Sequence, residues 1–203
     1  EAEDTQNRKL RNKDRTAIKD AIIFELLPKA FSYSRRTFAD IDPKGGWLMV
    51  DSGSSKKAED LVSLLRKCLG TLPVVPPATN QKPSSVMTQW LINNQPPGDI
   101  TIENECELRS LEEEGGIIRC KKQDLTQPEI KNHLDTGKQV LKLAVSWNDR
   151  MSFILDESLA VKRLRFLDMI QEQAAETDVQ DETGQFDVDF SIMSLELAGL
   201  LPR

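Results

Sequence analysis

Apolar residues recur every three or four positions through residues 4–27 and predict one long amphipathic helix. The apolar stripe consists of Leu10, Ala17, Ile18, Ala21, Ile22 and Leu26. Arg11, Arg15 and Lys19 repeat every four residues and are expected on another face of the helix. Pro28 should end it, because the residue before a proline disfavours the helical conformation. We therefore expect a projecting helix or one arm of a helical hairpin.

The pattern of residues 37–75 is typical of a small unit that mixes strands with one helix. Two β-prone runs flank the turn sequence PKGG at 43–46, which predicts a β-hairpin. A helix should follow over 54–69, because serines can cap its start and Gly70 can end it. A short strand is expected over 72–75. This order of elements favours the α+β class.

The rest of the chain alternates between turn-rich breaks and periodic segments. The proline-containing break at 76–85 is the expected boundary between sub-domains. Three closely spaced strands, at 140–147, 151–156 and 159–164, predict a meander. The other expected elements are strands at 100–109 and 116–123 and helices at 86–92, 127–134, 166–176 and 186–201. The prediction is an α+β fold in which helices pack on mixed or antiparallel sheets.

Positive charge is concentrated in residues 8–36, although the chain of 203 residues has a net charge of −6. This stretch holds nine Lys or Arg and three Asp or Glu. A local charge that opposes the global sign indicates a localised surface for a polyanion. No run of apolar residues approaches the roughly 18 needed to span a bilayer, so no membrane association is predicted.

Residues suited to catalysis or metal binding are few. His133 is the single histidine, which argues against a histidine-based triad or a multi-histidine zinc site. Cys68, Cys106 and Cys120 have no CxxC spacing, which favours a reducing, cytoplasmic compartment. Phosphate-cradling glycine motifs are absent from the sequence. We predict no enzyme activity, no cofactor and no metal site.

Two alternatives remain open. Asp40 and Asp42 alternate at a strand end and could serve a metal-dependent nuclease, although the turn that follows is the favoured explanation of both. The acidic C-terminal part could instead make the chain a protein–protein interaction module for a basic partner. Aromatic residues make up 5% of the chain and are not interleaved with the charges, which disfavours base stacking as the main binding mode. Sequence-independent phosphate binding is favoured.

Four runs of sequence resemble one known family. They are ELLPKAFSYSRRTF (25–38), KKAEDLVSLLRKCLGTLPVVP (56–76), ECELRSLEEEGGIIRCKKQDLT (105–126) and GQFDVDFSIMSLELAGLLP (184–202). Their order and spacing are similar to those of the bacterial recombination-associated RdgC family. The resemblance runs nearly end to end. Family members begin earlier and continue slightly further, so we expect this chain to be a segment of a longer protein.

The resemblance implies a nucleoid-associated protein that binds double-stranded DNA, with single-stranded DNA as a second candidate ligand, and restrains RecA in recombination. It implies a horseshoe-shaped monomer, two of which close into a ring that encircles DNA. On this basis residues 1–29 would form a helical tip, 30–82 a central α+β region and 83–203 a base with C-terminal helices.

The resemblance also implies roles for individual residues. Matched by position, the DNA-facing cations are Arg8, Lys9, Lys29 and Lys138. The basic pattern of the N-terminal stretch adds Arg11, Arg15, Arg35 and Arg36 as DNA-binding residues. Phe31 is the expected contact for ring closure at the tip, and Lys122 with Gln123 are the expected dimer contacts at the base. For Phe31, packing between helix and strand is an equally good explanation.

Overall fold

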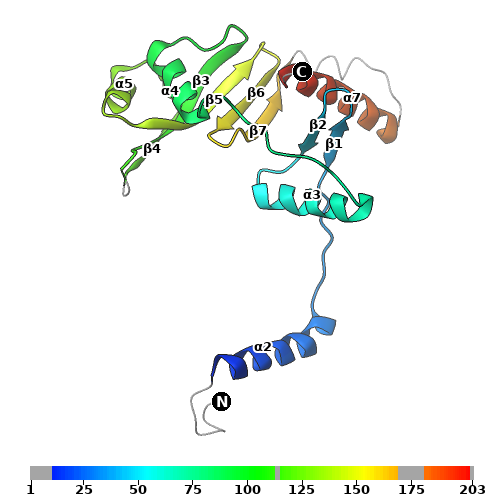
Figure 1. Ribbon diagram of the computed structural model, residues 1–203. Helices are drawn as coiled ribbons and strands as arrows, with labels where there is room; N and C mark the ends of the chain where they lie inside the picture. Colours follow the sequence, from blue (N-terminus) through cyan, green and yellow to red (C-terminus); the bar gives the residue numbers. More distant parts are fainter. Residues whose placement is uncertain (1–10, 113–114, 169–180, 202–203) are drawn as a thin grey trace. The chain divides into compact units, whose positions relative to one another are not determined.

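The computed structural model describes residues 11–112, 115–168 and 181–201 (Figure 1). The chain divides into two compact units, Glu1–Arg36 and Thr37–Arg203, which we call the N-terminal and C-terminal units. Secondary structure comprises helices and two antiparallel sheets, which confirms the predicted α+β class. No helix within the described ranges is long and apolar enough to cross a membrane.

The N-terminal unit consists of helix α2 (Asn12–Leu26), the short 3₁₀ turn η1 (Leu27–Lys29) and an extended segment, residues 30–36 (Figure 1). The predicted end of the helix is confirmed, and Pro28 lies in the 3₁₀ turn that follows it. The predicted start, residues 4–10, lies outside the described residues. None of the α2 residues is buried, and Phe24 is 83% exposed. Packing inside this unit therefore does not account for the apolar positions of α2.

The predicted hairpin is present as β1 (Ala39–Asp42) and β2 (Trp47–Val50), with Asp42 opposite Trp47. The Asp42 carboxylate accepts hydrogen bonds from the backbone N–H groups of Lys44 and Gly45, at 3.0 and 2.9 Å. Gly46 has a φ of 74°, which glycine adopts without steric cost. The side chain of Asp42 thus shapes the turn between the two strands.

Helix α3 (Ser55–Leu69) begins and ends where the sequence predicts, with Gly70 at a φ of 80°. The strand predicted at 72–75 is wrong, because this segment is irregular. The guanidinium of Arg66 donates to the carbonyls of Leu72 and Val74, both at 3.0 Å. These backbone acceptors are satisfied by a side chain from α3 rather than by a neighbouring strand.

The larger sheet has five antiparallel strands in the order β4-β3-β5-β6-β7. They are β3 (Ile100–Arg109), β4 (Ile117–Lys121), β5 (Gln139–Trp147), β6 (Met151–Asp156) and β7 (Val161–Phe166). Strands β5, β6 and β7 pair in sequence order, so the predicted meander is confirmed. Helices α4 (Pro83–Asn93) and α5 (Pro128–Asp135) are also confirmed. The break at 76–85 is shorter than predicted, because Pro83 already begins α4.

The core of the C-terminal unit lies between one face of this sheet and helices α4 and α5. Its fully buried side chains include Met87 and Leu91 from α4 and Leu108, Val140, Leu143 and Val145 from the sheet. The hydroxyl of Thr88 accepts a hydrogen bond from the backbone N–H of Val140 at 2.9 Å. Cys106 and Cys120 face each other across β3 and β4 in this core as free thiols. Burial raises the pKa of the Cys106 thiol, which keeps it protonated.

The opposite face of the sheet is polar and concave. Arg163 on β7 donates to Glu105 on β3 at 2.5 Å, although β5 and β6 lie between them in the strand order. Three strand spacings on a flat sheet would separate these backbones by about 14 Å. The sheet must therefore curl to bring the two side chains together. Arg163 has a φ of 53°, next to a register shift between β6 and β7.

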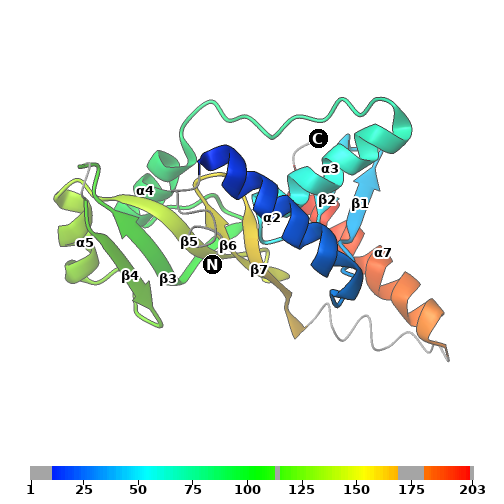
Figure 2. The same ribbon diagram turned by 90° about the horizontal axis from the view of Figure 1, so that it is seen from below.

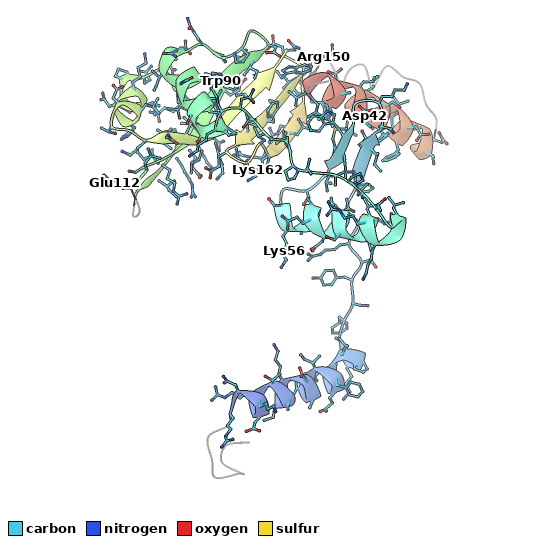
Figure 3. The ribbon with its side chains drawn as sticks, in the orientation of Figure 1. Asp42, Lys56, Trp90, Glu112, Arg150 and Lys162 are labelled. Carbon is cyan, nitrogen blue, oxygen red and sulfur yellow. The ribbon has the colours of Figure 1, made fainter. Side chains whose placement is uncertain are left out.

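Helix α7 (Glu182–Leu200) connects the two sheets of the C-terminal unit (Figure 2). Its Glu196 forms a two-pronged ion pair with Arg150, in the turn between β5 and β6 (Figure 3). The hydroxyl of Ser194 donates to Asp40 on β1 at 2.7 Å. The helix starts four residues earlier than predicted, because the Asp181 side chain accepts from the Gly184 N–H at 3.1 Å.

Most of the helix predicted over 166–176 falls on residues 169–176, outside the described residues. Phe166 belongs to β7 instead of that helix.

Asp156 at the end of β6 holds the turn into β7 and is 6% exposed. Its carboxylate accepts from the Ser158 and Ala160 N–H groups, both at 2.9 Å, and pairs with Lys162 at 2.6 Å. Burial by itself would raise the pKa of Asp156, but the hydrogen bonds from Lys162, Ser158 and Ala160 outweigh it. They hold the pKa below its usual value.

We expect Asp156→Asn to destabilise the C-terminal unit and to flatten its response to acid. Because the folded pKa lies below the unfolded value of about 4, the stabilisation is complete above that value. It is lost as the pH falls through the folded pKa. At pH 7 the loss should be on the order of 2 kcal/mol. Urea unfolding at pH 7 and pH 3 measures both effects. If the difference in unfolding free energy between the two pH values is the same in the variant as in the unaltered protein, this role of Asp156 is contradicted.

Candidate nucleic-acid interface

Helix α2 carries cations next to apolar side chains on one side of the helix. Arg15 and Lys19 line a shallow hollow together with Ile18, Ile22 and Ile23. The prediction that cations and apolar residues occupy separate faces is therefore wrong. Residues three, four and seven positions apart share a helix face, so Arg15 lies beside the isoleucines. This surface can meet a charged backbone and an apolar group at once.

The segment after α2 places further cations and aromatic side chains in solvent. Lys29 lies in η1, and Arg35 and Arg36 lie in the extended segment beyond it, all three exposed. Phe31 is 101% exposed, so the alternative of packing between helix and strand does not hold in the N-terminal unit. Arg35 donates to the Tyr33 hydroxyl at 2.9 Å and lies 4.8 Å from the centre of its ring.

The described part of the N-terminal unit, residues 11–36, holds seven Lys or Arg and three Asp or Glu. Every one of these seven cationic side chains is exposed. Arg8 and Lys9, two of the predicted DNA contacts, lie outside the described residues. Among the predicted contacts, Arg11, Arg15, Lys29, Arg35 and Arg36 thus belong to one unit with an excess of exposed positive charge.

The remaining predicted site residues lie in the C-terminal unit. Lys138, half-buried, donates to the Thr136 hydroxyl at 3.3 Å just before β5. Lys122 is exposed directly after β4, with a φ of 53°. Gln123 donates from its backbone to Asn104 at 3.2 Å and from its side chain to Glu129 at 3.4 Å.

Lys138 and Lys122 are not brought together. The neighbour of Lys138, Gln139, lies opposite Arg109 on β3, whereas Lys121, which precedes Lys122, lies opposite Glu105. Four residues along a strand correspond to about 13 Å. The two lysines therefore lie at separate places on the sheet.

Four cations on the concave face of the sheet, Arg119, Lys142, Lys162 and Arg163, are held by acidic side chains. Glu107 pairs with both Arg119 and Lys142 at 2.9 Å, and Lys162 pairs with Asp156. Burial alone would raise the pKa of Glu107, but hydrogen bonds from Lys142 and Arg119 outweigh it and lower that pKa. The sequence shows these cations, but the acids that neutralise them come from other strands and are revealed only by the strand pairing.

The carboxylates of the nuclease hypothesis have structural partners. Asp40 accepts from Ser194, and Asp42 accepts from the backbone of its own turn. Among the described residues, no three His, Cys, Asp or Glu side chains gather in a group that could hold a metal ion. The geometry thus ties both carboxylates to the fold.

Comparison with known proteins gives a match over the full chain. A family model described as "Putative exonuclease, RdgC" matches residues 1–203. A Pseudomonas aeruginosa protein named recombination-associated protein RdgC is 48% identical over 202 residues, which cover 100% of this chain and 66% of the relative. Relatives of the same name from Aeromonas hydrophila and Tolumonas auensis are each 47% identical. They cover 97% and 100% of this chain, and 65% and 67% of their own lengths.

The chain spans about two thirds of the length of the curated relatives it matches. The two descriptions emphasise different things, since the family model names an exonuclease and the relatives are named for recombination. Both point to the same family, and the match extends over every residue of the chain. This chain therefore belongs to the RdgC family.

Proposed function

We propose that this chain is the DNA-binding part of a recombination-associated protein that contacts duplex DNA through its phosphates, without reading sequence. One observation carries the proposal. The C-terminal unit pairs four cations of its concave face with acids, whereas residues 11–36 expose an excess of positive charge. This contrast supports the N-terminal unit as the surface that attracts a polyanion, within a chain of net charge −6.

The spacing of the cations on α2 suits a nucleic-acid backbone. Arg11, Arg15 and Lys19 recur every four residues, which corresponds to about 6 Å along a helix axis. A duplex carries closely spaced phosphates along each strand, so a row of cations on one helix can neutralise more than one of them. Lys29, in the turn after α2, adds a point charge, which suits contact with a phosphate without fixing its geometry.

The proposed assembly is a homodimer that closes around the duplex. An aromatic side chain as exposed as Phe31 gains stability when another surface covers it, which supports a role for Phe31 in joining two copies. Lys122 and Gln123 would form the second contact between the copies. Arg8, Lys9 and Lys138 would join the cations of the N-terminal unit in lining the enclosed DNA. A closed ring on DNA would limit RecA in recombination and associate the protein with the nucleoid.

Retention on circular DNA tests the proposal. We expect the full-length protein to remain on a closed circular duplex after dilution into buffer with competitor DNA, because a ring cannot slide off a molecule without ends. The same duplex cut once should lose the protein from its ends within the same time. Co-sedimentation of the labelled protein with each DNA form measures the difference.

Phe31→Ala supplies the matched variant for this experiment. It should bind both forms at first and then leave them at the same rate, because the charges remain while the ring opens. Equal retention of the unaltered protein on circular and cut DNA would contradict encirclement. Capture of a basic protein partner with no binding to any DNA would support the interaction-module alternative. Shortening of the cut DNA with Mg²⁺ or Mn²⁺ would support the exonuclease named in the family description.

A further inference from the structure

The extended segment after α2 carries a preformed aromatic–guanidinium pair. Arg35 lies over the ring of Tyr33, 4.8 Å from its centre, and its Nη2 donates to the Tyr33 hydroxyl at 2.9 Å. These two contacts involve only the two side chains themselves. They fix the orientation of the tyrosine ring before any ligand arrives, which reduces the entropy that binding would cost.

The ring of Tyr33 remains accessible although the guanidinium lies on one of its faces. The residue is 74% exposed, and neighbouring Phe31 is 101% exposed. Phe31, Tyr33 and Arg35 occupy alternating positions of this segment, and the contact of Arg35 with the Tyr33 ring places those two side chains on one side. Aromatic and basic residues interleave in this segment. The aromatic content of the whole chain, 5%, did not reveal this local pattern.

We propose that Tyr33 and Arg35 form a stacking site for an unpaired nucleobase of single-stranded DNA. A base would stack on the open face of the Tyr33 ring, opposite the guanidinium. Arg35 uses one of its five N–H donors for the tyrosine hydroxyl, so its others can reach the adjoining phosphate. Stacking of this kind accepts any base, since every base offers a flat aromatic face.

A base-paired duplex does not fit this site. The faces of its bases are covered by their neighbours in the stack, and an aromatic side chain reaches them only where the duplex opens or ends. Phosphate contacts by Lys29 and Arg36 on either side of the pair would serve both kinds of DNA. The stacking site thus adds affinity for single strands to a surface that holds both forms by charge, and it deepens the proposed function, on which it rests.

Replacement of the ring tests the site in the full-length protein. We expect Tyr33→Leu, which keeps an apolar side chain, to weaken binding to a short single-stranded oligonucleotide by roughly 5- to 150-fold, the contribution of one aromatic–base stack. Binding to the matched duplex should change by less than about twofold. Tyr33→Phe keeps the ring and should retain single-strand binding. Fluorescence anisotropy at constant salt measures the affinities of the unaltered protein and of both variants for the two forms of DNA.

A spectroscopic probe reports on the same residue directly. Tyr33 is the single tyrosine of this chain, so a fluorotyrosine label gives one ¹⁹F resonance here, identified by its disappearance in Tyr33→Phe. It should shift on addition of the single strand and remain in place with the duplex. The stacking site is wrong if Tyr33→Leu leaves binding to both forms of DNA unchanged, or weakens both equally. It is also wrong if the resonance does not move when the single strand is added. In either case the proposed function stands. Absence of binding to both forms by the unaltered protein would instead refute the proposed function itself.

Discussion

Raising the salt concentration from about 50 to 200 mM is expected to weaken duplex binding by about 10⁴-fold. The expectation follows from the eight proposed contacts, Arg8, Lys9, Arg11, Arg15, Lys29, Arg35, Arg36 and Lys138. Each phosphate that is neutralised releases counterions, and the logarithm of the affinity falls by about 0.9 per contact for each tenfold rise in salt. Titration of labelled duplexes of unrelated sequence across this range measures the slope. A nearly flat response would refute the electrostatic mechanism.

Substituting three cations of the N-terminal unit tests whether this unit supplies the charge that binds DNA. Replacing Arg11, Arg15 and Lys29 together by alanine should lower affinity by about 10²–10³-fold at 100 mM salt and reduce the slope by about 3. The loss should be equal for unrelated sequences, because phosphates carry no sequence information. The matched control removes Lys44, Lys67 and Lys131, three exposed cations of the C-terminal unit.

The control changes the net charge by the same amount and should leave most of the affinity intact. Equal losses in the two triple variants would mean that net charge, rather than the N-terminal unit, drives binding. A loss confined to one DNA sequence would indicate base recognition instead. Circular dichroism of each variant verifies that the helices are retained.

Leu143→Ala is expected to lower the free energy of unfolding of the C-terminal unit by about 3–5 kcal/mol. Leu143 is 0% exposed on β5, the middle strand of the five-stranded sheet. Its loss leaves a cavity between the sheet and the helices that the surrounding strands cannot close, because their backbones are held by hydrogen bonds on both sides. Urea unfolding followed by tryptophan fluorescence measures the change.

Leu195→Ala provides the matched control, since it removes the same atoms from a side chain that is 73% exposed on α7. It should change stability by less than about 0.5 kcal/mol. Equal effects of the two substitutions would show that the face of the sheet that carries Leu143 is not the core of this unit. A normal response to salt in Leu143→Ala, under conditions where it remains folded, would show that stability and DNA binding are separable.

The elements predicted best are those whose start and end signals lie in neighbouring residues. The hairpin follows from the turn at Gly45 and Gly46, and α3 ends at Gly70 as predicted. The meander follows from short β-prone runs separated by tight turns. Interactions over a few residues decide these features, so a single sequence contains the information.

The prediction of a strand at 72–75 was wrong because that feature depends on a residue outside the segment. Its residues are β-prone, but a strand needs a partner, and here Arg66 takes the carbonyls that a partner would bind. The early start of α7 depends on Asp181, a capping residue that lies before the periodic pattern begins. In both cases hydrogen bonding by one side chain overrides the apolar pattern.

By itself, the sequence determined the class of fold, the extent of most elements, the concentration of positive charge near the start and the resemblance to a family. All of these depend on composition, on short-range spacing or on ordered runs of residues. Which cations of the five-stranded sheet are paired with acids follows only from the pairing of its strands and from its curl. Arg163 meets Glu105, 58 residues away, because the sheet curls, and no local pattern encodes that contact. The tertiary structure also places Arg35 against Tyr33, since the orientation of side chains on an extended segment is fixed by contact and not by spacing.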